Sequence, residues 1–70
     1  MSDLNARILA AHAAGDGAAL VTLYTEAADQ APDADSCGFF LTHAYIFALE
    51  AGHADAPALH ARLKADGREA

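Results

Sequence analysis

The 70-residue sequence has few cationic side chains and only one cysteine. Four lysines and arginines stand against ten aspartates and glutamates, which gives a net charge of −6 at pH 7. Nucleic acids and anionic membranes bind proteins through basic surfaces, so we expect neither as a partner. The lone Cys37 cannot form a disulfide within the chain, and the first residues lack the basic and apolar regions of a secretory signal. Both features predict a cytoplasmic protein.

The sequence also lacks the motifs on which catalysis and cofactor binding depend. It has no glycine-rich phosphate loop after a strand and no His-Glu-x-x-His pair on a helix. Cys37 and His43 are six residues apart, which places them on different sides of a helix, so the cysteine has no base within reach. The uncharged stretch from Cys37 to Leu49 has thirteen residues, too few to cross a membrane, which takes about 20. We therefore expect a protein that is not an enzyme and has no cofactor.

What the sequence does contain is alanine, which accounts for 20 of its 38 hydrophobic residues. Alanine favours helices but buries little surface. A chain of this length forms one domain, 1–70, with a thin core. The larger apolar residues are expected to build that core: Leu4, Ile8, Leu9, Leu20, Val21, Leu23, Tyr24, Phe39, Phe40, Leu41, Tyr45, Ile46, Phe47, Leu49, Leu59 and Leu63.

Helix-starting and helix-ending residues divide the first half of the chain into two segments. Ser2 or Asp3 can cap a first helix, and Gly15 can end it in a left-handed conformation. Asp16 can cap a second helix, in which apolar residues recur at helical spacing. Pro32 ends that helix, because proline lacks the amide N–H that a helix interior needs.

Helix-starting and helix-ending residues also divide the second half of the chain into two segments. A third helix is expected to begin at Asp35 or Ser36 and to run up to Gly52. A fourth helix is expected to begin at Asp55 and to end near Gly67. The predicted fold is all-α, with four short helices arranged as two antiparallel hairpins, either a repeat-like pair or a small orthogonal bundle.

The expected third helix is apolar on nearly every side. Phe39, Ile46 and Phe47 are assigned to one side, and Leu41, Tyr45 and Leu49 to another. Such a helix is central to a bundle or is buried in a partner. Three short, alanine-rich neighbours are not expected to cover it, so we predict self-association through this helix as a homodimer. The alternative is a monomer in which the other helices cover the third.

Part of the sequence resembles the tetratricopeptide repeat. After the turn at Gly15-Asp16, residues Leu20, Tyr24, Ala27 and Pro32 stand at the spacings of that family, and Leu41, Ala44, Tyr45 and Ala48 would begin a second repeat. The turn glycines Gly15 and Gly52 are 37 residues apart, compared with roughly 34 in the family. The resemblance implies helical hairpins that hold another protein or peptide in a groove, and it implies no catalytic residues.

The predicted function is that of a small protein–protein interaction module. Aromatic residues of the third helix are the expected interface anchors, because such residues dominate binding energy at interfaces. These candidate binding residues are Phe39, Phe40, His43, Tyr45 and Phe47. The alternative is a metal- or redox-responsive regulator that uses Cys37, at the start of a helix, together with the His53 and His60 region.

Overall fold

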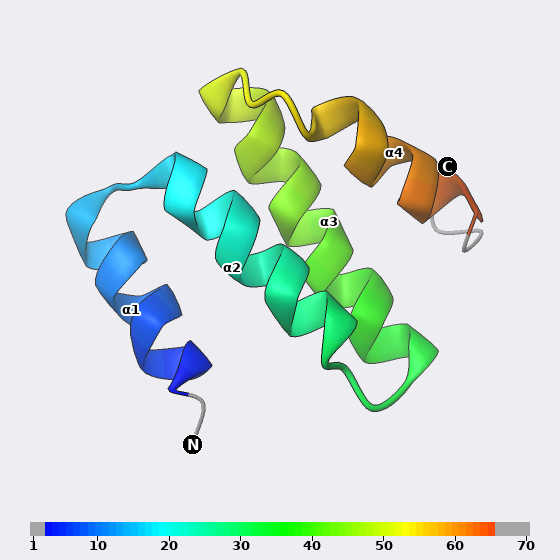
Figure 1. Ribbon diagram of the computed structural model, residues 1–70, viewed down its shortest axis with the longest axis horizontal. Helices are drawn as coiled ribbons and strands as arrows, with labels where there is room; N and C mark the ends of the chain where they lie inside the picture. Colours follow the sequence, from blue (N-terminus) through cyan, green and yellow to red (C-terminus); the bar gives the residue numbers. More distant parts are fainter. Residues whose placement is uncertain (1–2, 66–70) are drawn as a thin grey trace.

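The computed structural model describes residues 3–65, and within that range the chain is helical with no strand. Four α-helices follow one another along the chain: α1 (Leu4–Ala14), α2 (Gly17–Asp29), α3 (Ala34–Ala51) and α4 (Ala56–Ala65) (Figure 1). The predicted all-α fold with four short helices is therefore confirmed. In the part of the chain described, none of the helices is long and apolar enough to cross a membrane.

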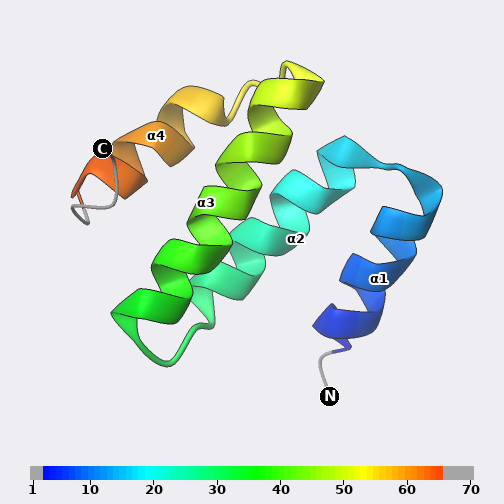
Figure 2. The ribbon, with the colours of Figure 1, turned by 180° about the vertical axis from the view of Figure 1, so that it is seen from behind.

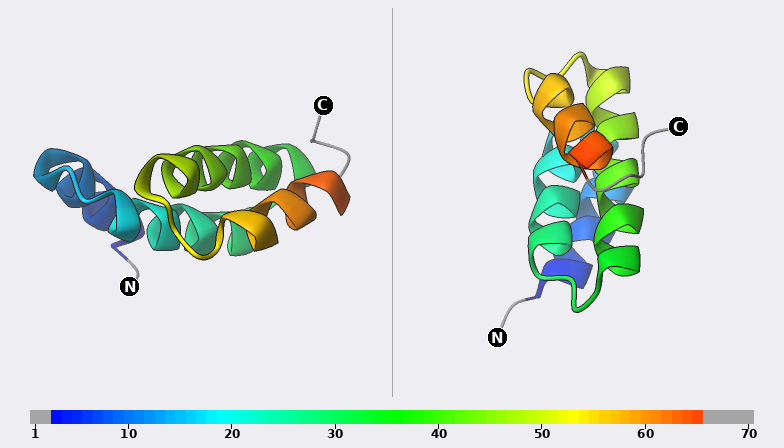
Figure 3. Two further views of the ribbon diagram at one scale, coloured as in Figure 1. Left: turned by 90° about the horizontal axis from the view of Figure 1, so that it is seen from above. Right: turned by 90° about the vertical axis from the view of Figure 1, so that its right-hand side faces the viewer.

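The helices lie side by side in chain order, each antiparallel to the next, and the view from behind shows the same row (Figures 1 and 2). Seen from above, α3 lies over α2, with α1 at one end of this pair and α4 toward the other (left panel of Figure 3). The chain measures 31 × 28 × 15 Å along its principal axes, so it is a thin slab. The most extensive packing is between α2 and α3, while α1 packs on α2 and α4 packs on α3.

Several helix ends form as the sequence predicts. Gly15 and Gly52 adopt the left-handed conformation, with φ of 67° and 63°, and end α1 and α3. Glycine is favoured at both positions because a side chain would be strained there. The carboxylate of Asp16 accepts a hydrogen bond of 3.1 Å from the backbone N–H of Ala19, which caps α2.

Two predicted boundaries are wrong by a few residues. Helix α3 begins before Asp35, because the carboxylate of Asp33 accepts a hydrogen bond of 2.7 Å from the N–H of Ser36 and acts as the cap. Helix α2 ends at Asp29 rather than at Pro32, since the residue before a proline is disfavoured in a helix. Asp3 precedes α1 without a side-chain capping bond. Ser2 and Gly67 lie outside the described residues.

The core consists of two clusters that both include residues of α2, and Tyr24, Phe40 and Phe47 pack against both of them. One joins α2, α3 and α4 through Val21, Ala28, Leu41, Ala44, Ala48, Leu59 and Leu63. The other joins α1 to α2 through Ile8, Ala11, Leu20, Leu23 and Ala27. The expected core list is wrong for four residues, because Leu9, Phe39, Ile46 and Leu49 are exposed. Small residues of α3 occupy much of the interior in their place.

Candidate functional site

Three large apolar side chains of α3 are exposed on one face of the helix. Phe39 is 57% exposed, Ile46 46% and Leu49 57%. Their separations of seven and three residues place them along one side of the helix, with exposed Thr42 between them. We call Phe39, Ile46 and Leu49 the α3 row. The prediction that the chain leaves its apolar third helix partly uncovered is confirmed.

The α3 row is exposed because the opposite face of α3 makes the close contacts. Leu41, Ala44 and Ala48 are fully buried there. At one end of the pair, a Cβ atom placed on Gly17 of α2 would lie 3.7 Å from the Cβ atom of Ala51, so the two helices approach closely. The sides assigned from the sequence are therefore partly wrong, since Leu49 lies with Phe39 and Ile46 rather than with buried Leu41.

Acidic residues stand at both ends of the α3 row. Asp35 precedes Phe39 by four residues and Glu50 follows Ile46 by four, so both fall on the side of the row. Both residues are exposed. Their separation along the helix axis is about 22 Å, at about 1.5 Å per residue. Helix α3 contains neither lysine nor arginine, and its two carboxylate residues are Asp35 and Glu50.

A cluster of rings lies beside the row, with Tyr24 of α2 as its shared member. The ring of Tyr24 stacks on His43 and Phe47 at centroid distances of 5.4 and 5.7 Å, and it lies 6.2 Å from Phe40. Phe39 joins the cluster through His43, at 4.4 Å. Four of the five predicted interface residues therefore lie together, although only Phe39 of the four is exposed.

Helix α1 reaches this ring cluster through His12. The Nε2 atom of His12 lies 2.9 Å from the Tyr24 hydroxyl, and its ring lies 5.5 Å from that of Phe47. His43 is positioned by its Nδ1 atom, which lies 2.9 Å from the backbone carbonyl oxygen of Phe39. The sequence interpretation missed His12 and Tyr24 because three helices must pack before these rings meet, and no local spacing signals that contact.

Tyr45, the fifth predicted interface residue, belongs to a different surface. Its ring stacks on that of His60 from α4 at 5.5 Å, and it packs against the core cluster between α2, α3 and α4. Tyr45 therefore helps to hold α4 on α3. It does not join the ring cluster around Tyr24.

The residues of the alternative metal or redox site are spread over the fold. Cys37 is half-buried in the first turns of α3 and packs against the core. His53 follows the other end of α3, and its Nδ1 atom accepts a hydrogen bond of 3.0 Å from the N–H of Asp55. Cys37 and His53 are thus separated by about 24 Å along the helix axis. Between residues 3 and 65, no three His, Cys, Asp or Glu side chains are grouped to hold a metal ion.

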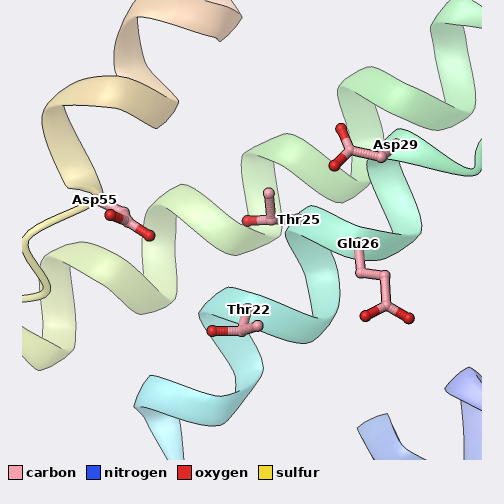
Figure 4. Close-up of a pocket in the computed structure, with 5 residues that line it drawn as sticks. All are labelled: Thr22, Thr25, Glu26, Asp29 and Asp55. Carbon is pink, nitrogen blue, oxygen red and sulfur yellow. The ribbon is translucent and has the colours of Figure 1, made fainter.

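An open pocket of about 300 Å³ lies along α2, lined by Thr22, Thr25, Glu26, Asp29 and Asp55 (Figure 4). Two of its carboxylates are in ion pairs between helices. Glu26 binds Arg7 of α1 at 3.2 Å, and Asp29 binds Arg62 of α4 at 2.9 Å. The hydroxyl of Thr25 donates to the carbonyl oxygen of Val21. Two of the five lining residues, Glu26 and Asp29, thus connect α2 with its neighbours.

Comparison with known proteins finds no family model that matches this chain, no similar curated protein and no similar solved structure. The most distinctive feature of the described residues is the exposed apolar row on α3, with an acidic residue near each end.

Proposed function

We propose that this chain is a small protein–protein interaction module, acting in the cytoplasm, and that the α3 row is its contact surface. The observation that carries the proposal is the exposure of Phe39, Ile46 and Leu49 on one face of a single helix. If a whole large side chain has about 150–250 Å² of surface, the row exposes on the order of 300 Å². Apolar patches of this size are often binding sites.

The same face supports self-association, but only a weak one. Two copies that met through the α3 row would bury about 600 Å² of apolar surface. Interfaces are a little over half apolar, so the whole contact would cover about 1,000 Å², near the lower limit for a specific interface. We therefore expect a dimer that forms with micromolar or weaker affinity and dissociates on dilution.

Light scattering on the eluate of a gel-filtration column, over a wide range of protein concentration, tests the proposal. The average mass is expected to rise with concentration, and Ile46→Glu is expected to keep the chain monomeric by placing a charge in the contact. Leu9→Glu is the matched control, because Leu9 is also exposed, at 62%, but lies on α1. A chain that is monomeric at every concentration, or that Leu9→Glu disrupts equally, would remove self-association through α3.

We also propose that the helix pairs stack as tetratricopeptide repeats do, and that this stacking leaves the α3 row exposed. The succession of antiparallel helices, each packed on the next, supports it (Figure 1). A chain of two such repeats would be short for the family, in which about three repeats are needed for stability. Fusion of a third consensus repeat after residue 70 tests the idea, since a cooperative gain in melting temperature is expected only if the helix pairs stack as repeats.

A further inference from the structure

We infer that self-association through the α3 row is controlled by pH, with His43 as the sensing group: its neutral imidazole permits the contact between two copies, and its protonation opposes that contact. This inference rests on the proposed function and specifies how the contact is regulated. It is carried by the position of His43, between the exposed row and the ring cluster around Tyr24.

His43 borders the α3 row on the side that faces α2. It follows Phe39 by one helical turn, and the two ring centroids are 4.4 Å apart. The imidazole also stacks on the ring of Tyr24 from α2, at 5.4 Å. Phe39 is 57% exposed and His43 is half-buried. A second copy that covers Phe39 therefore also removes water from the neighbouring imidazole.

The hydrogen bond of His43 determines which nitrogen gains the proton. Its Nδ1 atom lies 2.9 Å from the backbone carbonyl oxygen of Phe39. Since a carbonyl oxygen only accepts, Nδ1 carries the hydrogen in the neutral imidazole and Nε2 holds the lone pair. Protonation adds a positive charge at Nε2 and keeps the bond to Phe39. The face of the Tyr24 ring attracts a cation, so the single chain accommodates the charge and the change acts on the contact rather than on the fold.

The titratable groups around His43 come from the three helices that meet at the ring cluster. Tyr24 of α2 stacks on it, and His12 of α1 lies 2.9 Å from the Tyr24 hydroxyl. On α3, Asp35 and Glu50 are eight and seven residues away, beyond the spacing of an ion pair along one helix. The charged side chains within α1 and α2 are engaged in ion pairs: Arg7, Glu26 and Asp29.

A second copy brings a second His43 to the same contact. The row extends from Phe39 to Leu49, so its midpoint is next to His43. In a symmetric pair of antiparallel α3 helices, residues near that midpoint lie close to their own equivalents. Two protonated imidazoles would then repel each other and lose hydration together. Association is therefore expected to be strongest above the range in which histidine changes charge, about pH 5 to 8, and to weaken as the pH falls through it.

The net charge of the chain predicts the opposite dependence on pH. With neutral histidines the chain carries a charge of −6, and protonation of its four histidines makes that charge smaller. Repulsion between two copies would then decrease. If net charge alone governed association, the dimer would be stronger at low pH, so the direction of the change separates the two causes.

The test is sedimentation equilibrium of the full chain at about pH 5.5 and about pH 8, at equal ionic strength. We expect the dimer dissociation constant to be about tenfold larger at the lower pH, because each of the two charges changes affinity a few-fold. His43→Gln and His43→Phe, which retains a ring beside Tyr24, should both remove this increase. Circular dichroism of each protein at both pH values checks that the helices remain formed, and two variants are used in case one fails to fold.

His60→Gln is the matched control. His60 is also a half-buried imidazole stacked on a tyrosine, at 5.5 Å from Tyr45, but it lies on α4 and not beside the α3 row. Its replacement makes the same change in titratable charge as His43→Gln. We therefore expect this variant to keep the increase of about tenfold at low pH.

The outcomes separate the regulation from the proposed function. A dimer whose dissociation constant does not increase at low pH, or increases equally in the His43 variants, would overturn control by His43 and leave the α3 row as a contact surface. An increase that His60→Gln removes as completely as His43→Gln would also overturn it, since the effect would then follow total charge. A chain that is monomeric at both pH values and at every concentration would overturn self-association and its regulation together.

Discussion

On the face of α3 that meets α2, Leu41, Ala44 and Ala48 are 0% exposed, whereas on the opposite face Phe39, Ile46 and Leu49 are about half exposed. The buried face is thus built mainly from small residues, and larger apolar residues lie outside. Two helices approach closely when small residues face each other, and the larger side chains are then displaced to the flanks. In this chain, therefore, the size of an apolar side chain does not predict its burial.

Leu41→Ala should have the largest effect, because Leu41 is the largest fully buried side chain of α3. Removing its methyl groups loses the transfer free energy and leaves a cavity, at a cost of about 3 kcal/mol in the free energy of unfolding. Urea denaturation followed by circular dichroism measures the change. A loss below about 1 kcal/mol would show that the buried face tolerates a gap and is less close-packed than the burial implies.

Ala48→Leu tests the same buried face by adding side-chain volume instead of removing it. A larger side chain at this fully buried position would push α3 away from its neighbours, and we expect a loss of about 2 kcal/mol. In a domain of this size that corresponds to a fall in melting temperature of about 10 °C. A variant as stable as the original would mean that α2 and α3 can move apart without loss of stability. That result would contradict close packing on the buried face of α3.

Phe47→Ala and Phe39→Ala compare the same substitution at two positions on α3. Phe47 packs against both core clusters, while Phe39 is mostly exposed. We expect a loss of about 2 kcal/mol for Phe47→Ala and about 0.5 kcal/mol for Phe39→Ala, measured by thermal and urea unfolding. Equal losses would show that the ring cluster, rather than burial alone, decides the contribution of each phenylalanine.

Ile46→Gln should have the smallest effect on stability and a clear effect on binding. The side chain is 46% exposed, so the free energy of unfolding should change by no more than about 0.5 kcal/mol. Association measured by light scattering should nevertheless weaken, because the contact loses its central apolar residue. If stability falls by as much as it does for Leu41→Ala, the α3 row belongs to the core and not to a binding surface.

The sequence predicts the helices well because their ends depend on local chemistry. Gly15, Gly52 and Asp16 act at the ends of helices as expected, since a left-handed turn or a capping bond involves only neighbouring residues. The start of α3 was misplaced because Asp33, which caps the helix, lies just before the predicted caps Asp35 and Ser36, and all three are residue types that favour this position. Only the direction of the N–H of Ser36, toward Asp33, decides between them.

The candidate site was harder to predict because α3 has no polar face to mark its outer side. Helical spacing groups residues by side, but it does not say which side meets α2 when apolar residues surround the helix. Of the residues predicted to form an interface, Phe39 is exposed, whereas Phe40 and Phe47 are half-buried. Ile46 and Leu49 were expected in the core, and the packing of Ala44 and Ala48 against their neighbours explains why they are not there.

The slab shape described above has a consequence for amide hydrogen exchange. The backbone of α1 packs on α2 alone and that of α4 on α3 alone, with His12 and the Arg62–Asp29 ion pair as further connections. A terminal helix held by one neighbour can open locally at a lower free energy than the whole domain. We therefore expect amides of α2 and α3 to exchange only through global unfolding, and those of α1 and α4 to exchange earlier and independently of each other. The proposed contact surface then lies on the most protected part of the molecule, so a partner would bind a helix that is already ordered.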